Sequence, residues 1–272
     1  MEEQVDRLVQ KTWGKAIPIL KAPQEQSEIS KSIWTKADPS LAKYKATPDS
    51  KRLMIAISGI PGSGKTTLAA TVGTRLNALH AQDVPCAATQ PIAAFIPMDG
   101  YHLSRAQLSA MPDPKTAHFR RGAAFTFDAP AFLALVQRLR EPLTPESSTL
   151  YAPSFDHAVK DPVADDIAIA PSARVLLFEG NYLSLDQGDW ARAARLMDEL
   201  WFVQVDVPVA RRRLVDRHVR SGIVKDADEA GHRADESDLK NGEEIIRDRI
   251  ADIQEIVVST EDETWAPQAH GG

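Results

Sequence analysis

The chain has 272 residues, of which 43% are hydrophobic, enough to form the two-sided core of one large α/β domain. Its formal net charge of -6 argues against a nucleic-acid-binding groove, which normally carries an excess of basic residues. Cys86 is the only cysteine, so no internal disulfide can form. No apolar run approaches the roughly 20 residues of a membrane span, and the acidic N-terminus lacks a secretory signal. We therefore expect a cytoplasmic protein with neither a nucleic-acid nor a membrane partner. A monomer or a homodimer is expected.

Residues 1–50 precede the first predicted strand. Apolar side chains recur on one face of a short helix there, which predicts that the helix docks on the domain: Val5, Leu8, Val9 and Trp13. From Lys15 to Ser50 the chain is rich in Lys, Ser, Gln and Pro without a sustained period, which indicates a loose extension. The expected division is a helix and extension over 1–50, a main domain over 51–262 and a tail over 263–272.

Residues 53–67 combine a strand, a glycine-rich turn and the start of a helix. The apolar run 53–57 predicts the strand, and apolar residues at helical spacing follow between 68 and 79. Between them the pattern G-x-x-x-x-G-K-[ST] is matched in full, in the order that a phosphate-binding loop requires. The residues expected to contact a nucleotide are Gly59, Ile60, Pro61, Gly62, Ser63, Gly64, Lys65, Thr66 and Thr67.

The composition of this loop has a physical reason. A β-phosphate needs several backbone N–H donors aimed at one point, and side chains at the three glycines would block the approach or the dihedral angles. The following helix adds its positive N-terminal end. Lys65 is expected to bridge the β- and γ-phosphates, and the Thr66 hydroxyl to hold Mg²⁺. The sequence thus predicts a bound nucleoside triphosphate, against the alternative of a glycine-rich turn that matches by chance.

Further strands alternate with helices along the chain. Continuous apolar runs predict strands at 93–98, 175–178, 200–207 and 255–259. Helices are predicted from Asp128, as N-cap with Pro130 in the first turn, and over 192–197, 209–220 and 241–253, with Gly222 ending the third. A mobile, Pro-containing stretch is expected at 111–116, and a long loop or short antiparallel excursion at 141–172. This pattern predicts an α/β fold: a parallel sheet covered by helices on both faces.

Two acidic residues follow predicted strands. Asp99 and Glu179 each stand at a strand's carboxyl end, where open parallel sheets bind ligands, and we expect both strands to neighbour the one before the phosphate loop. One carboxylate can take the proton of an acceptor hydroxyl, and the other can hold Mg²⁺, directly or through water. We assign Asp99 as the base and Glu179 as the metal-side acid, although the two roles could be swapped. Alternatively, either acid merely caps the next helix.

The predicted helix over 209–220 is dense in arginine. Arg213, Arg217 and Arg220 lie at i, i+4 and i+7 and so share one face. Such a run is often a solvated face, yet phosphoryl transfer needs cations over the γ-phosphate, and one such arginine can contribute about 10³–10⁵ in rate. We therefore expect a helical lid over about 211–240, with Arg213 and Arg217 as catalytic candidates and Arg220 as an ATP-binding one.

Loops near the two acids carry aromatic and basic side chains. The candidates for binding an acceptor are Tyr101, His102, Arg120, Arg121, Tyr151 and Phe155. Rings and fork-shaped donors suit a polyol, a nucleoside or an anionic acceptor. For each of these residues, a packed aromatic or a surface charge is an equally simple interpretation.

These segments together resemble a known family. GIPGSGKTT (59–67), MDGYH (98–102), RRGAAFTFD (120–128), YAPSFD (151–156), LLFEGNYL (176–183) and the arginine-rich helix are similar to the phosphoribulokinase/uridine kinase family of P-loop small-molecule kinases. The resemblance covers about 53–259, and MDG[YF]H and EGNYL recur in its uridine-kinase-like branch of fungi and bacteria. The first 50 residues find no match.

The resemblance implies a three-layer α/β/α P-loop NTPase fold with about five parallel strands and a lid that closes over ATP. It implies Asp99 as the base, Glu179 as a magnesium partner, and lid arginines on the helix that holds Arg213 and Arg217. Uridine kinases also carry a P-x-Y-D-x-x-x-H-x-R-like substrate loop. Here Lys160 stands at the histidine and the basic partner is missing, which counts against uridine as the acceptor.

We therefore expect an ATP- and Mg²⁺-dependent kinase that phosphorylates a hydroxyl of a small nucleoside-, sugar- or pantothenate-like metabolite. One alternative is a nucleotide-driven switch or assembly ATPase, which would need a water-positioning residue instead of an acceptor pocket. A second is a binding protein with a dead site, which the presence of Lys65, Thr66, Asp99 and Glu179 disfavours.

Overall fold

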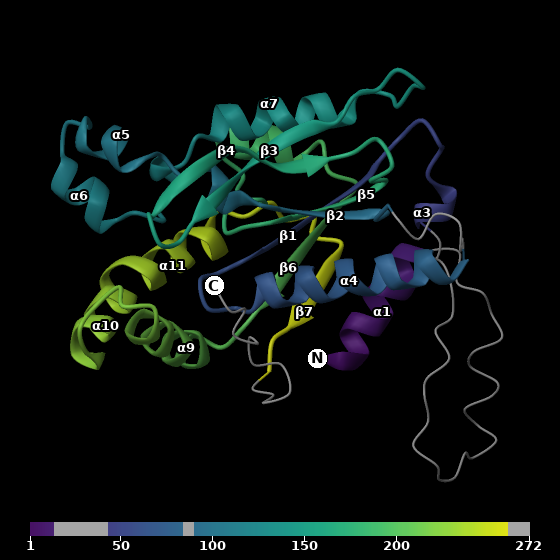
Figure 1. The fold of residues 1–272 in the computed structure, drawn as a ribbon. Helices are drawn as coiled ribbons and strands as arrows, with labels where there is room; N and C mark the ends of the chain where they lie inside the picture. The colour runs from purple at the N-terminus through teal and green to yellow at the C-terminus, as the bar shows by residue number, and fades with distance from the viewer. Residues whose placement is uncertain (14–42, 84–89, 261–272) are drawn as a thin grey trace, which may run out of the picture.

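A computed structural model describes residues 1–13, 43–83 and 90–260 (Figure 1). Most of the predicted extension between Lys15 and Ser50, Cys86 and the predicted tail over 263–272 lie outside the described residues. A short helix, α3 (Lys43–Ala46), precedes the first strand. None of the described helices combines the length and the apolar character needed to span a bilayer.

A five-stranded parallel sheet forms the centre of the molecule, as the sequence predicts. Its spatial order is β2-β5-β1-β6-β7, and every neighbouring pair runs parallel. The strands are β1 (Leu53–Gly59), β2 (Ala93–Pro97), β5 (Val175–Glu179), β6 (Glu199–Gln204) and β7 (Glu255–Val258). Both β1 and β5 are buried along their whole length, which explains their continuous apolar runs.

The strand order corrects one expectation. Glu179 does lie on the neighbour of β1, because Ile57 and Glu179 are in register. Asp99 does not, because β5 stands between β1 and β2, which makes β2 an edge strand. The apolar pattern of a strand records that both of its faces are covered, but it does not record which strands flank it.

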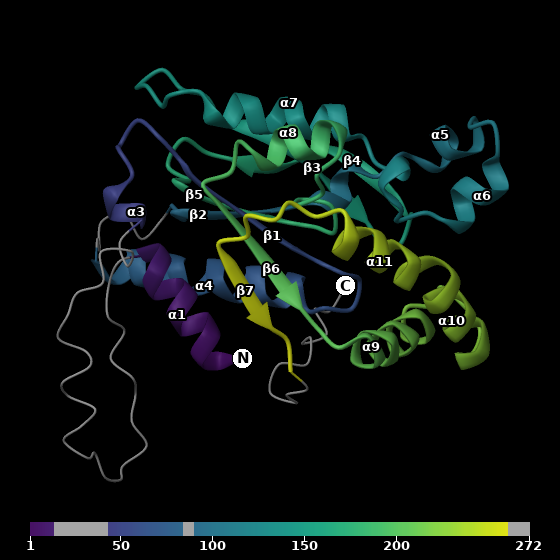
Figure 2. The ribbon, with the colours of Figure 1, turned by 180° about the vertical axis from the view of Figure 1, so that it is seen from behind.

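Helices cover both faces of the sheet (Figures 1 and 2). The helix α4 (Lys65–Asp83) packs on one face with α1 (Glu2–Trp13), and α7 (Ala129–Arg140) and α8 (Gly188–Ala194) lie on the other. Alternate residues of β1 supply the two cores: Ile55 and Ile57 join the cluster with α4, whereas Met54 joins the cluster with α7. The helix predicted over 192–197 is α8, which begins and ends earlier.

The N-terminal helix is part of this body. Its apolar face is buried as predicted, with Val5, Leu8, Val9 and Trp13 packed in the cluster that holds α4 and the sheet. Polar contacts add to the packing, since Lys11 Nζ lies 3.1 Å from Glu199 Oε1 and also pairs with Glu255 on β7. The helix therefore covers the edge of the sheet opposite to β2.

The region 141–172 contains an antiparallel hairpin, one of the two predicted alternatives. Its strands are β3 (Leu150–Asp156) and β4 (Asp161–Ile169). The stretch over 111–116, expected to be mobile, is partly helical: α5 (Arg105–Ser109) precedes it and α6 (Pro114–Phe119) begins within it. Asp113 caps α6 by accepting a hydrogen bond from Thr116 N, and Pro114 suits the first turn, so the proline begins a helix here.

The predicted lid consists of α9 (Val207–Arg220), α10 (Ala227–Arg233), the π-helical turn η5 (Ala234–Asp238) and α11 (Leu239–Arg247). Gly222 follows α9 with φ +61°, the left-handed conformation that ends many helices. The helix predicted over 241–253 ends at Arg247. In both views α9, α10 and α11 lie at the same end of the sheet as α5 and α6.

Candidate active site

The phosphate loop lies between β1 and α4 and is packed closely by its neighbours. Gly62 adopts φ +79°, and a Cβ there would lie 2.7 Å from the carbonyl oxygen of Ala210 on α9. A Cβ at Gly59 would lie 2.8 Å from the carbonyl oxygen of Val203 on β6. Larger residues would therefore push the loop away from the lid and the sheet. Close packing, as well as backbone conformation, thus requires glycine at these positions.

Lys65 is the buried cation of this loop. Its Nζ lies 3.4 Å from the carbonyl oxygen of Ile60 and 3.9 Å from Glu179 Oε1. Burial lowers the pKa of the Lys65 amine, and the charges of Glu179 and Asp99 oppose that change. Ser63 Oγ is buried, and no described residue forms a hydrogen bond with it. A buried ammonium group and an unsatisfied hydroxyl beside a glycine cradle fit a polyphosphate.

Asp99 and Glu179 line one cavity of about 800 Å³ together with Lys65 and Thr66. Their environments differ. The Glu179 side chain is only 8% exposed, and burial raises its pKa to about 7 despite the opposing charge of Lys65. The Asp99 side chain is 50% exposed. One carboxyl is thus enclosed beside the phosphate loop, and the other is open to an incoming molecule.

Two glycines that follow the acids bring these loops together. A Cβ at Gly100 would lie 2.1 Å from the carbonyl oxygen of Pro153 on β3, so the hairpin rests directly on the loop that carries Asp99. A Cβ at Gly180 would lie 2.3 Å from the Cβ of Met98. The loops after β2 and β5 therefore touch, which places Asp99 near the phosphate loop even though β2 is an edge strand. The glycine after each acid was the available sequence signal for this contact.

His102 is held beside Asp99. Its Nδ1 lies 2.8 Å from the backbone oxygen of Asp99, and its ring packs against Phe127 and Phe155 at centroid distances of 4.0 and 4.9 Å. Burial lowers the pKa of the His102 imidazole, against the pull of the Asp99 charge. Of the predicted acceptor-binding residues, His102, Arg121 and Phe155 line the cavity.

The other three predicted acceptor residues lie elsewhere. The Tyr101 side chain is 5% exposed and packs edge-on against Phe132 in the core, 5.2 Å between ring centroids. Arg120 turns toward α11 and donates to Asn241 Oδ1 at 2.6 Å. Tyr151 is 51% exposed on β3 and does not line the cavity. Adjacent residues of a loop point in different directions, so proximity in sequence to Asp99 did not distinguish Tyr101 from His102.

The three lid arginines are also separated by the fold. Arg217 lines the cavity, and its charge acts on Lys65 and Glu179. Arg213 instead donates to the carbonyl oxygen of Gly62 at 3.2 Å and to Ser259 Oγ at 2.9 Å, so it joins the phosphate loop to the end of β7. Arg220, the last residue of α9, is exposed and does not line the cavity. Of these three arginines, Arg217 alone therefore lines the cavity.

Comparisons with known proteins agree with this arrangement. An "ATP-dependent kinase-like protein" of Aspergillus versicolor is 60% identical over 160 residues, which cover 59% of this chain and 92% of the relative. A Schizosaccharomyces pombe protein, provisionally named a uridine kinase, is 42% identical over 191 residues, covering 70% of this chain and 77% of that one. This chain belongs to the phosphoribulokinase/uridine kinase family of P-loop kinases.

A solved structure supports the same assignment. The crystal structure of a Silicibacter protein, provisionally named a fructose transport system kinase, superposes with a TM-score of 0.65 at 29% identity, covering 84% of this chain and 96% of that one. No family model matches the chain. As a member of this kinase family the protein is a phosphotransferase that uses ATP, and its substrates are small molecules.

The kinase site also contains residues that the sequence analysis did not single out. His218 on α9 is buried, and its Nε2 lies 2.8 Å from Asp238 Oδ2 at the end of η5. Both residues line the cavity, as do Asn181 and Arg233. The contact between His218 and Asp238 joins α9 to η5 within the lid. The sequence indicated this placement of His218 only through helical spacing. His218 is four residues after the buried Leu214 and therefore lies on the same face of α9.

Proposed function

We propose that this kinase transfers the γ-phosphate of ATP to a hydroxyl group of a small metabolite, with Asp99 as the base. The observation that carries the proposal is the shared cavity: a half-exposed Asp99 carboxylate stands beside the buried pair of Lys65 and Glu179. The names of the relatives suggest nucleoside or sugar hydroxyls as acceptors. An exposed carboxylate in the same cavity as the phosphate loop suits an alcohol acceptor, whose proton it can accept.

In this mechanism the Asp99 carboxylate accepts the proton of the acceptor hydroxyl and orients that oxygen toward the terminal phosphorus. His102 helps to hold Asp99 in this position, because its ring nitrogen binds the Asp99 backbone oxygen and restrains the loop after β2. The buried Lys65 amine binds phosphate oxygens in surroundings that exclude water, where its charge acts strongly.

Mg²⁺ is the metal that we expect with ATP. The Thr66 hydroxyl and the Glu179 carboxylate adjoin each other and would hold the ion, as oxygen donors suit it. When bound, Mg²⁺ neutralises charge on the β- and γ-phosphates. Within the described ranges no three His, Cys, Asp or Glu side chains form a cluster. That fits a magnesium site built from one carboxylate, a hydroxyl, phosphates and water.

Arg217 supplies the second cation. It stands on α9, the helix whose residue Ala210 packs against the phosphate loop at Gly62, so lid and loop are in direct contact. From this position the guanidinium group can bind the transferred phosphoryl group and stabilise its developing charge. The lid also reduces the access of water, which would otherwise compete with the acceptor.

The test is a panel of small hydroxyl compounds scored by ATP-dependent gain in mass, run with the parent protein and with Asp99→Asn. We expect the variant to lose about 10²–10⁴ in transfer rate while its ATP affinity, measured by calorimetry, stays unchanged. Asp166→Asn, at an exposed position of β4, is the matched control and should behave as the parent. Transfer by Asp99→Asn at the parental rate would refute the base, and ATP hydrolysis without any modified acceptor would favour a switch ATPase.

A further inference from the structure

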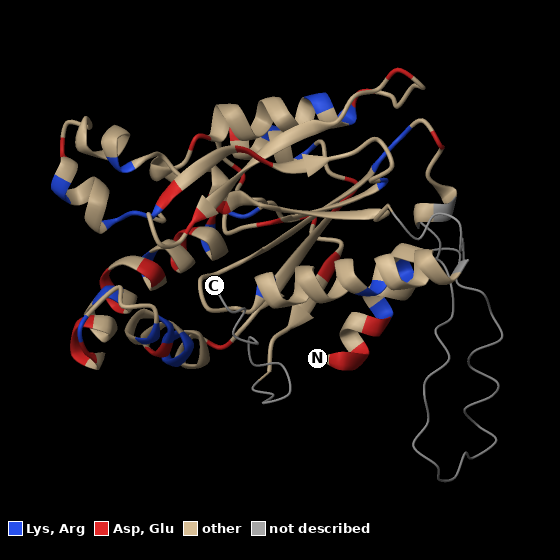
Figure 3. Ribbon diagram, in the orientation of Figure 1, with Lys and Arg blue, Asp and Glu red and all other residues tan. Residues whose placement is uncertain are grey.

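The part of the cavity wall near Asp99 is rich in basic side chains. Arg105 begins α5, Lys160 stands in the turn between β3 and β4, and both line the same cavity as Asp99. Arg121, His118 and His157 complete this part of the wall. The chain as a whole is acidic, with a formal net charge of -6. Figure 3 shows basic residues around α5 and α6 as well as on α9, at the end of the sheet where these helices lie.

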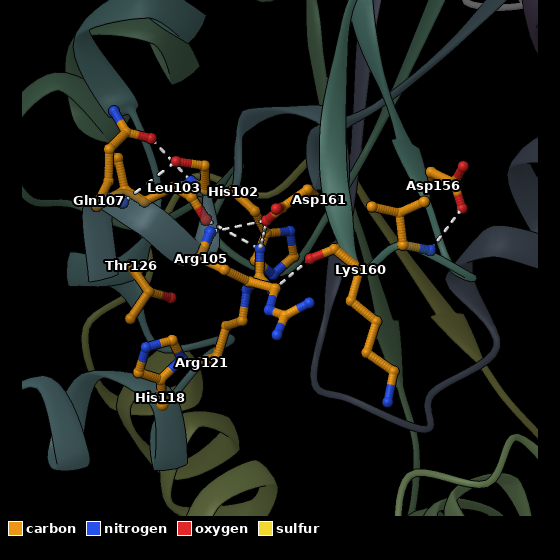
Figure 4. A network of polar contacts seen from close by, with 12 residues as sticks. His102, Leu103, Arg105, Gln107, His118, Arg121, Thr126, Asp156, Lys160 and Asp161 are labelled. Atoms are coloured by element: carbon orange, nitrogen blue, oxygen red, sulfur yellow. Dashed lines mark hydrogen bonds and ion pairs between the residues drawn. The ribbon is translucent and has the colours of Figure 1, made fainter. Parts of the chain in front are cut away.

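A hydrogen-bonded frame holds this wall in place (Figure 4). Asp161 Oδ1 accepts from the backbone N–H of Arg105 at 2.7 Å and from the Arg121 guanidinium at 3.2 Å. The same guanidinium donates to the carbonyl oxygens of Leu103, at 2.9 Å, and of Lys160. Arg121 and Asp161 thus pair with each other through a terminal nitrogen of the guanidinium and join α5 to the hairpin turn, so Arg121 acts as a positioning residue.

The frame leaves two cations without a partner. No described carboxylate pairs with the Arg105 guanidinium or with Lys160 Nζ, and in Figure 4 the Lys160 side chain extends away from the network. Lys160 also adopts φ +62°, a left-handed conformation that a residue with a side chain adopts at some cost. The bonds from Lys160 N to Asp156 O and from Arg121 to Lys160 O maintain it.

These cations lie on the acceptor side of the site. The phosphate loop follows β1, in the middle of the sheet, and the cations near it are Lys65 and Arg217. Arg105 and Lys160 instead belong to the segments packed around the loop after β2, the edge strand that carries Asp99. A molecule whose hydroxyl reaches Asp99 from the open side would therefore extend toward Arg105 and Lys160.

We propose that the acceptor is an anion, a hydroxy acid or a phosphate ester, whose carboxylate or phosphate is bound by Arg105 and Lys160 while its hydroxyl reaches Asp99. The proposal rests on the kinase function argued above and specifies the class of its acceptor. Charge-assisted hydrogen bonds to a bidentate guanidinium and to an ammonium group are the strongest available for such an anion. A neutral polyol or nucleoside would leave both cations unused.

The test measures equilibrium binding, so that it does not depend on transfer. The parent protein is loaded with a non-hydrolysable ATP analogue and Mg²⁺, and matched compounds are titrated calorimetrically: glycerol, glycerate and glycerol 3-phosphate, then ribose, ribonate and ribose 5-phosphate. We expect at least one anionic member to bind tenfold or more tightly than its neutral counterpart. The carboxylate and phosphate arms then distinguish the two sources of charge.

Variants assign the effect to residues. Arg105→Gln with Lys160→Gln should weaken the anionic compound about ten- to hundredfold, with unchanged affinity for the ATP analogue. Lys115→Gln, on α6 but outside the cavity lining, is the control and should change nothing. Equal binding of neutral and anionic members, equal weakening of both by the variant, or no binding of any of the anionic members would overturn the proposal. Anion binding without any phosphoryl transfer would instead refute the kinase step alone.

Discussion

Asp99 and Glu179 are two carboxyl groups of one cavity that differ in their surroundings. Both follow parallel strands and both line the cavity, yet one is half-exposed and the other is enclosed beside Lys65. An enclosed carboxyl is poorly placed to meet an incoming hydroxyl but well placed to bind an ion held by the phosphates. The difference in exposure is our reason for assigning the base role to Asp99.

The enclosure of Glu179 has a consequence for stability in the nucleotide-free protein. Its pKa is raised in the folded state from an ordinary value near 4.5 to about 7. The bound proton therefore contributes to the free energy of unfolding, and this contribution is complete below about pH 4.5. That contribution is lost as the pH rises through about 7. Glu179→Gln should therefore gain stability relative to the parent over this window, by on the order of 3 kcal/mol.

Urea unfolding at a series of pH values measures this difference. Glu146→Gln, at an exposed loop position, is the control and should parallel the parent at every pH. A constant difference between Glu179→Gln and the parent from pH 4 to 8 would show that Glu179 is not protonated preferentially in the folded protein.

At the scale of elements, the site depends on contacts among loops that end different strands. The hairpin β3–β4 lies on the loop after β2, and that loop lies on the one after β5. The lid in turn contacts the phosphate loop through α9 and is tied to β7 by Arg213. Each functional residue is thus placed by a segment far away in sequence.

Gly100→Ala tests the contact between hairpin and base. The added Cβ would lie 2.1 Å from the backbone oxygen of Pro153, so one of the two segments must move. We expect the free energy of unfolding to fall by about 1–3 kcal/mol. Because Asp99 is the preceding residue, turnover should fall more than ATP affinity does. Gly73→Ala in α4, where the Cβ would lie 3.4 Å from Leu177 Cδ1, is the control. Denaturant midpoints and steady-state kinetics provide the measurements, and parental turnover in Gly100→Ala would contradict the expectation.

The lid arginines give a comparison within one helix. Arg217→Ala should lower the turnover number by about 10³ or more with little change in stability, because its guanidinium faces the cavity. Arg213→Ala should lower the melting temperature, because it removes hydrogen bonds that join Gly62 to Ser259. Arg220→Ala, at an exposed position outside the lining, should resemble the parent in both assays. If Arg213→Ala instead lost turnover while keeping its parental melting temperature, Arg213 would be the catalytic arginine.

At the scale of the whole molecule, two hydrophobic cores on either face of the sheet support an active end. The helix α1 belongs to one of these cores and pairs through Lys11 with Glu199 and Glu255. It lies far from Asp99 in the order of the sheet, next to β7. We therefore attribute to α1 a role in stability and none in the phosphoryl-transfer chemistry.

Leu8→Ala provides the test of that role. Leu8 is fully buried, so its truncation should cost about 2–5 kcal/mol of unfolding free energy. The Michaelis constants of the protein that remains folded should not change. Glu3→Ala, at an exposed position of the same helix, is the control. A change in ATP affinity with Leu8→Ala at temperatures well below its melting point would indicate that α1 communicates with the site.

The sequence by itself determined the features that depend on residues close together in the chain. The phosphate loop, the apolar face of α1, the capping of α7 by Asp128 and the end of α9 at Gly222 all follow from local patterns. Buried strands, and hence a covered parallel sheet, follow from continuous apolar runs. These features are local because backbone hydrogen bonding and side-chain periodicity act over a few residues.

Only the tertiary structure decided the strand order and which predicted residues line the cavity: His102 does and Tyr101 does not, and Arg217 does and Arg213 does not. It also decided that Lys160 lines the same cavity as Arg105. Each of these depends on which distant segment lies opposite: Phe132 for Tyr101, Ser259 for Arg213 and Asp161 for Arg105. A local pattern records that a side chain is apolar or charged. Its partner is set by the packing of segments tens to more than a hundred residues apart, which no local pattern contains.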